Sequence, residues 1–124
     1  AGTNDIAGNT GPLTTAQIFD NMVSMVELAE ANGIVPIVSS ILPAAKYPWK
    51  PEVDSVGPIL ELNTMLKYYC EGKGLVYLDY FSEMVDDVNG LPEALSYDGV
   101  HPTDEGYQVM EPLALTAINE ALKD

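Results

Sequence analysis

The chain has 124 residues, with 5 lysines or arginines against 19 aspartates or glutamates, so its net charge is −14. This length supports one domain with one core, and 47% hydrophobic with 19% charged residues excludes a disordered or fibrous chain. The acidic surface disfavours nucleic acid and anionic lipid as partners. No apolar run reaches the ~20 residues that a membrane helix needs. Because Cys70 is the only cysteine, an internal disulfide and a cysteine metal cluster are excluded.

The first expected helix begins at Thr14. Thr14 can cap the helix while Gln17, three residues later, reaches back to it as in a capping box. Apolar residues then recur at helical spacing until Gly33, which is placed to end the helix. The next stretch, residues 34–42, is apolar and rich in β-branched side chains, which is typical of a buried parallel strand. We place Pro36 at the first residues of this strand, because a central position would cost a ladder hydrogen bond.

A proline-rich loop, residues 43–58, leads from this strand to the second expected helix. Pro58 suits the first turn of that helix, and Gly72 and Gly74 are expected to end it. The apolar face of the helix consists of Ile59, Leu62, Leu66 and Tyr69. Residues 75–79 then predict a second buried strand.

The last third of the chain is expected to hold two helices joined by a loop. A short helix covers residues 81–87, and residues 91–102 are mainly loop. Thr103 can cap a final helix over residues 103–122, which Pro112 should kink. The residues expected to face the core from this helix are Tyr107, Met110, Ala114, Ala117, Ile118 and Ala121.

The order of these elements predicts an α/β fold with a parallel sheet. Two parallel strands are too few for a stable sheet that helices cover on both faces. Residues 1–3 also look like the last part of a further strand. We therefore expect the chain to begin inside a domain, with N-terminal strands that lie outside this chain.

Two polar clusters are candidates for chemistry. One is Gly2-Thr3-Asn4-Asp5, and the other is Asp98-Gly99-Val100-His101 in the loop before the last helix. Both can lie outside the carboxyl ends of the strands, where parallel α/β sheets bind ligands. Asp98 can reach the ring of His101, the only histidine, and leave the other ring nitrogen to act as a general base. The neutral amide of Asn4 suits an oxyanion hole.

These clusters resemble two conserved blocks of the SGNH (GDSL) hydrolases, Gly-x-Asn-Asp and Asp-x-x-His, in the order and spacing of that family. The resemblance implies an esterase or acylhydrolase with a three-layer, flavodoxin-like fold, a small-molecule ester substrate and no cofactor. His101 would be the base, Asp98 its orienter and Asn4 an oxyanion donor. The family's serine nucleophile lies upstream of the Gly-x-Asn-Asp block. Residues 1–124 are therefore expected to be the C-terminal part of a single SGNH hydrolase domain, with the missing N-terminal segment of the same protein as partner.

Several features allow more than one interpretation. Ser39 and Ser40 end a strand, but they lack the flanking glycines of a nucleophile elbow and are expected to bond the backbone. Tyr47 and Trp49 can line an acyl or leaving-group pocket, or belong to a plain surface loop in which Trp49 is buried. No metal site is expected, because the acidic residues fit no EF-hand and one histidine makes a poor zinc site.

Two functions therefore remain open for the chain. It is either most of a serine esterase whose nucleophile lies upstream, or a non-catalytic binding or assembly module on a degenerate hydrolase scaffold. The substrate stays open, because acylated sugars, short-chain esters, lysophospholipids and thioesters all fit the family. Many bacterial relatives are exported, which favours a secreted or periplasmic location.

Overall fold

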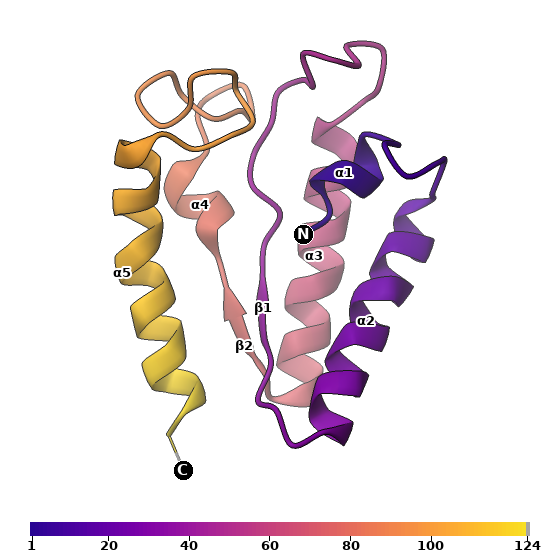
Figure 1. Cartoon of the computed structure of the whole chain (residues 1–124), viewed down its shortest axis with the longest axis vertical. Coiled ribbons are helices and arrows are strands. Elements are labelled where there is room, and N and C mark those ends of the chain that lie inside the picture. The colour runs from indigo at the N-terminus through magenta and orange to yellow at the C-terminus, as the bar shows by residue number, and fades with distance from the viewer. Residues whose placement is uncertain (124) are drawn as a thin grey trace.

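A computed structural model describes residues 1–123 and consists of a short parallel sheet with helices on both sides (Figure 1). Its elements in chain order are α1 (Thr3–Ile6), α2 (Thr15–Ala31), β1 (Ile37–Ser39), α3 (Val56–Lys73), β2 (Val76–Leu78), α4 (Tyr80–Met84) and α5 (Asp104–Ala121). The expected α/β class is confirmed.

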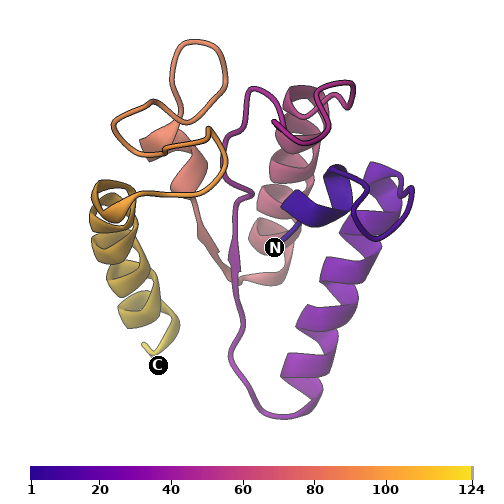
Figure 2. The ribbon, with the colours of Figure 1, turned by 45° about the horizontal axis from the view of Figure 1, so that its top comes forward.

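The two strands run parallel and form the middle layer. Val38 of β1 lies opposite Tyr77 of β2. Helix α3 packs against β2 and α2, whereas α5 packs against both strands and α4. Figures 1 and 2 show α5 on one side of the strand pair and α2 and α3 on the other, which gives the three layers that we expected. The loop after β1 and the loop between α4 and α5 lie at the same end of the molecule.

Helix α2 begins as its sequence predicts. The Thr14 hydroxyl accepts a hydrogen bond from the Gln17 backbone N–H at 3.1 Å, and the Gln17 side chain accepts one from the Thr14 N–H at 2.9 Å. This reciprocal capping box satisfies two N–H groups that the helix itself cannot bond. Asn32 is the C-cap of the helix, so the helix ends directly before Gly33, as predicted.

Strand β1 is shorter than the predicted strand of residues 34–42. Ile34 and Val35 are exposed and precede the strand. Pro36 has no N–H to donate to a neighbouring strand, so pairing starts only after it. The strand prediction was therefore correct in place and type but too long.

The carboxyl end of β1 is held by side chains instead of a longer ladder. Asn63 of α3 accepts a hydrogen bond from the Ile41 N–H at 2.7 Å and donates one to the Ile41 carbonyl at 3.1 Å. Ser40 is buried, and its hydroxyl accepts a hydrogen bond from the Phe81 N–H at 2.9 Å. Ser40 therefore bonds the backbone at the strand end, as expected.

Helix α5 exposes more apolar surface than its spacing predicts. Thr103 caps it through a hydrogen bond from the Gly106 N–H, and the helix continues through Pro112. Ala117 is buried, but Tyr107 and Ile118 are exposed, so the prediction that these two face the core is wrong. The reason is that α5 packs against a narrow sheet and the short helix α4, which cover only part of its apolar face.

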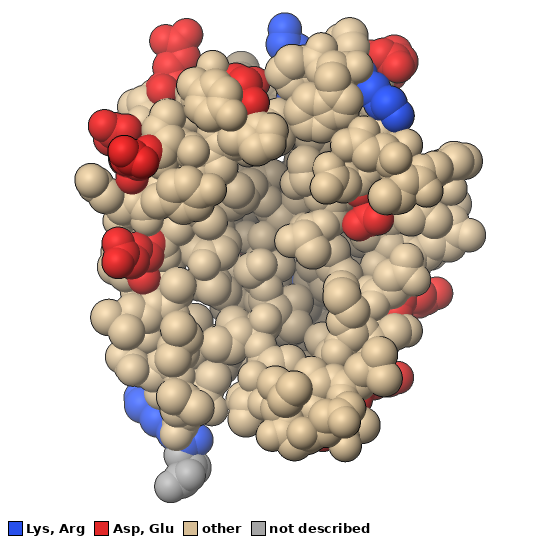
Figure 3. Space-filling view, viewed as in Figure 1, with Lys and Arg blue, Asp and Glu red and all other residues tan. Residues whose placement is uncertain are grey.

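The charge distribution follows the composition. Acidic side chains lie mainly along the edges of the face shown in Figure 3, and much of its centre carries no charge. Within residues 1–123, no helix combines the length and apolar character needed to cross a membrane.

Candidate functional site

The turn that contains Asp98 and His101 brings a carboxylate directly onto an imidazole. Asp98 Oδ2 lies 2.6 Å from His101 Nδ1. The other carboxylate oxygen, Oδ1, accepts hydrogen bonds from the backbone N–H groups of His101 at 2.7 Å and Val100 at 2.8 Å. One side chain thus holds both the backbone of the turn and the orientation of the ring.

The same contacts determine the ionisation of Asp98. Partial desolvation opposes its charge, but the hydrogen bonds from His101 and Val100 outweigh that effect and lower the pKa of Asp98 to about 2. An ionised carboxylate only accepts hydrogen bonds, so the His101 proton resides on Nδ1. The side chain of His101 is 60% exposed. In the neutral ring with its proton on Nδ1, Nε2 carries the lone pair that a general base requires.

Ser96 supports this turn, and the sequence analysis did not single it out. Its buried hydroxyl donates to the His101 carbonyl at 2.7 Å and accepts from the Gly99 N–H at 2.9 Å. A serine that precedes Asp and Gly in a loop is a common turn former, and this was the signal available. Ser96 thus stabilises the backbone of the turn that carries His101.

The loop before α5 packs closely against the first turn of that helix at Gly106. The Thr103 N–H bonds the Leu95 carbonyl at 2.9 Å. A Cβ on Gly106 would lie 2.5 Å from the Leu95 carbonyl oxygen and 2.9 Å from Pro102 Cβ. Only glycine allows this approach of helix and loop.

Replacing Gly106 with alanine is therefore expected to destabilise the protein by about 1–3 kcal/mol, because the backbone at Leu95 must move to accept the methyl group. Urea unfolding monitored by circular dichroism measures the change. Gly72→Ala in the last turn of α3 is the matched control, because its Cβ would meet nothing within 4 Å. The control should stabilise by about 0.5–1 kcal/mol from helix propensity. Equal effects of both substitutions would contradict the packing argument.

Asn4 lies on the short helix α1 and is exposed. Gly2 is the N-cap of this helix, and its φ of 103° suits glycine. A Cβ at Gly2 would lie 2.8 Å from Ile41 Cδ1 and 3.0 Å from Met22 Cε. The first glycine of the Gly-x-Asn-Asp cluster thus lets α1 rest on the loop that follows β1.

Trp49 connects the two polar clusters. Its indole N–H donates to Asn9 Oδ1 at 3.1 Å, and Asn9 Nδ2 donates to Asn4 Oδ1 at 3.0 Å. The ring of Trp49 lies 6.4 Å from that of His101, between centroids. The structure therefore brings Asn4 and the Asp98–His101 pair to one region, at the carboxyl ends of the strands, as expected from their positions in the sequence.

The two aromatic residues predicted to line a pocket differ in their surroundings. Trp49 is 42% exposed, whereas Tyr47 is fully buried and its ring stacks on that of Trp49, with 5.3 Å between the ring centroids. The expectation that Tyr47 contacts a substrate is therefore corrected: Tyr47 packs in the core and supports Trp49. An exposed ring that the sequence analysis missed, Tyr97, stacks on His101 at 6.1 Å.

Replacing Tyr47 with phenylalanine is expected to raise the free energy of unfolding by about 1 kcal/mol. The Tyr47 hydroxyl is buried without a hydrogen-bond partner among the described residues, and burial raises its pKa to about 12. Phenylalanine keeps the stacking on Trp49 and removes the unpaired group. The measurement is the urea midpoint at constant slope. A loss of stability would mean that the hydroxyl has a partner, such as a buried water.

Within residues 1–123, no three His, Cys, Asp or Glu side chains form a group that could hold a metal ion.

Comparison with known proteins identifies the group of enzymes to which this site is related. Residues 1–109 match the model of the GDSL-like lipase/acylhydrolase family. The chain is 46% identical to a protein from Bacteroides fragilis assigned as an acylhydrolase (TM-score 0.95), and 42% identical to a GDSL-like lipase from Bacteroides thetaiotaomicron (TM-score 0.94). The matches cover 99% and 98% of this chain but 60% of each relative, so the chain spans about three fifths of their length.

A more distant structure extends the comparison. A protein from Desulfitobacterium hafniense, assigned to the G-D-S-L family of lipolytic proteins, is 26% identical with a TM-score of 0.73, and the match covers 94% of this chain and 61% of that one. No curated protein matches the chain. The family match extends over most of the sequence, including both polar clusters, and we conclude that the chain belongs to the GDSL-like lipase/acylhydrolase family.

Proposed function

We propose that this protein is a serine esterase in which His101 is the general base, Asp98 orients it and Asn4 donates to the oxyanion. The observation that carries the proposal is the 2.6 Å contact between Asp98 Oδ2 and His101 Nδ1, in a histidine whose side chain is 60% exposed. This is the base-and-orienter half of a nucleophilic triad. Membership of the GDSL-like family supports ester hydrolysis as the reaction.

The proposed reaction has two halves. His101 Nε2 takes the proton of a serine hydroxyl as the serine oxygen attacks the ester carbonyl, and the oxyanion that forms accepts a hydrogen bond from Asn4 Nδ2. The C–O bond to the alcohol then breaks, and the alcohol leaves with the proton from His101. Water, deprotonated by the same nitrogen, attacks the acyl-serine and releases the acid.

The nucleophile in this proposal comes from a segment of the protein outside residues 1–124. Of the six serines in the chain, none has a hydrogen bond to the His101 ring among the described residues. Ser40 and Ser55 are buried and bond backbone groups, and Ser96 lies beneath the turn. These contacts support a serine that reaches Nε2 from elsewhere.

A fluorophosphonate probe tests the assignment in the protein as its gene encodes it. The probe labels a serine that a neighbouring base activates, and mass spectrometry of the digested protein locates the label. We expect one labelled serine outside residues 1–124, and no label after His101→Ala. Labelling of Ser39 or Ser40 would overturn the proposed nucleophile. Absence of both labelling and p-nitrophenyl ester hydrolysis would favour the non-catalytic binding module instead.

A further inference from the structure

The side chains of Trp49, Asn9 and Asn4 form a hydrogen-bonded chain. The choice of donor and acceptor in the first bond determines the choice in the second. An indole N–H can only donate. Because Trp49 Nε1 lies 3.1 Å from the Asn9 side chain, the atom that it meets must be the Asn9 oxygen. The Asn9 nitrogen then points the other way, to the Asn4 oxygen at 3.0 Å.

The orientation of Asn4 follows from this order. Its oxygen accepts from Asn9, and its Nδ2 group has no acceptor within residues 1–123, so it remains able to donate. Turning the Asn4 amide over would place two NH₂ groups against each other and lose the bond. Asn9 is also held by a backbone bond, from its N–H to the Asn4 carbonyl at 3.0 Å. Asn9 thus contacts both the backbone and the side chain of Asn4.

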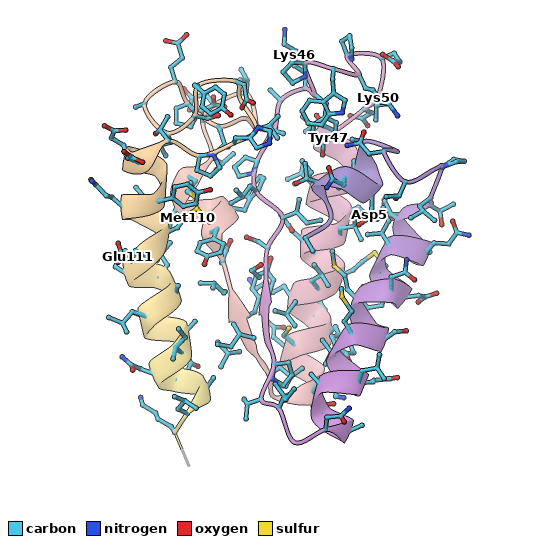
Figure 4. All side chains as sticks on the ribbon, in the orientation of Figure 1. Asp5, Lys46, Tyr47, Lys50, Met110 and Glu111 are labelled. Atoms are coloured by element: carbon cyan, nitrogen blue, oxygen red, sulfur yellow. The ribbon has the colours of Figure 1, made fainter. Side chains whose placement is uncertain are left out.

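Trp49 is held by a stacked ring and by the anchoring of its loop. Tyr47 stacks beneath its ring at 5.3 Å. The next residue, Lys50, ties the loop to the turn before Asn9, because its Nζ donates to the Gly8 carbonyl at 3.1 Å. Figure 4 shows Tyr47 and Lys50 on this loop, beside α1. The indole N–H is therefore a positioned donor on a supported loop.

We propose that Asn9 and Trp49 are positioning residues, which hold the Asn4 amide with its N–H groups turned toward the oxyanion. This inference rests on the proposed esterase function and adds to it. Since the bond between Trp49 and Asn9 spans 40 residues, it also couples the loop after β1 to α1. Part of the oxyanion hole is thus set by a residue that does not touch the reacting atoms.

Trp49→Phe in the protein as its gene encodes it tests the proposal. Phenylalanine keeps a ring between Tyr47 and His101 but removes the N–H. We expect kcat for p-nitrophenyl acetate to fall about tenfold, less than the ~100-fold expected for Asn4→Ala, with KM nearly unchanged. In an Asn4→Ala background, Trp49→Phe should cause no further loss, because the group that it orients is gone. Asn9→Ala should reproduce both results. Tyr68→Phe, at an exposed position of α3, is the matched control and should leave both constants unchanged.

Two outcomes would overturn the inference while leaving the proposed function intact. Trp49→Phe could raise KM without lowering kcat, which would make Trp49 a wall of the binding site only. It could also cause the same loss with and without Asn4, which would make the two residues independent. Failure of the proposed function is distinct, because His101→Ala would then retain activity. Thermal unfolding of each variant separates these results from loss of fold.

Discussion

His101→Ala is expected to lower kcat/KM for ester hydrolysis by at least about 10³-fold in the protein as its gene encodes it. In the proposed mechanism the imidazole takes the serine proton, and Asp98 lies on its Nδ1 in a side chain that is largely exposed. Stability should change by less than about 1 kcal/mol, because the ring is largely exposed and exposed ion pairs contribute little. Steady-state kinetics with p-nitrophenyl acetate and urea unfolding measure the two effects.

Added imidazole provides the control for this variant. The exposure of the His101 side chain implies that a small base can enter the space that alanine leaves. Part of the lost rate should then return with imidazole concentration, which a misfolded variant would not show. Near-normal hydrolysis by His101→Ala would end the assignment of His101 as the base.

Asp98→Asn should be nearly as damaging to turnover, with kcat lower by about 10³–10⁴-fold. Asparagine keeps an oxygen that accepts from the backbone N–H groups of His101 and Val100. It places an NH₂ group against Nδ1, so the histidine proton moves to Nε2, where the lone pair is needed. The turn should remain folded while the base is lost.

Asp20→Asn is the matched control, because Asp20 is an exposed aspartate of α2. It removes the same charge and should leave kcat unchanged. Nitrogen-15 NMR of the histidine ring reports the tautomer directly, and a shift of the proton from Nδ1 to Nε2 is expected only in Asp98→Asn. If Asp98→Asn and Asp20→Asn were equally active, Asp98 would have no orienting role.

The features that could be predicted from the sequence are those formed by near neighbours. The Thr14–Gln17 capping box and the Asp98–His101 contact each span three residues. At such separations, side-chain reach and local backbone geometry decide the contact, whatever the rest of the fold does. The order of helices and strands was readable for a related reason, since periodicity reports which residues face a core.

The features that could not be predicted depend on how distant segments pack. Trp49 meets Asn9 across 40 residues, and no local pattern encodes that meeting. The burial of Tyr47 and the exposure of Ile118 likewise follow from which neighbours cover them. Strand β1 was predicted too long because the length of a strand depends on its partner as well as on its own residues.

The bond between Asn63 and Ile41 has a consequence for the site as a whole. Asn63, on the buried face of α3, forms two hydrogen bonds with the backbone of Ile41. The Ile41 side chain in turn packs against Gly2, directly before α1. Asn4 follows two residues later. The position of the amide proposed to face the oxyanion thus depends on contacts in the hydrophobic interior. If Asn4 has the proposed role, a substitution that disturbs the buried Asn63–Ile41 contact should therefore lower the catalytic rate as well as the stability of the protein.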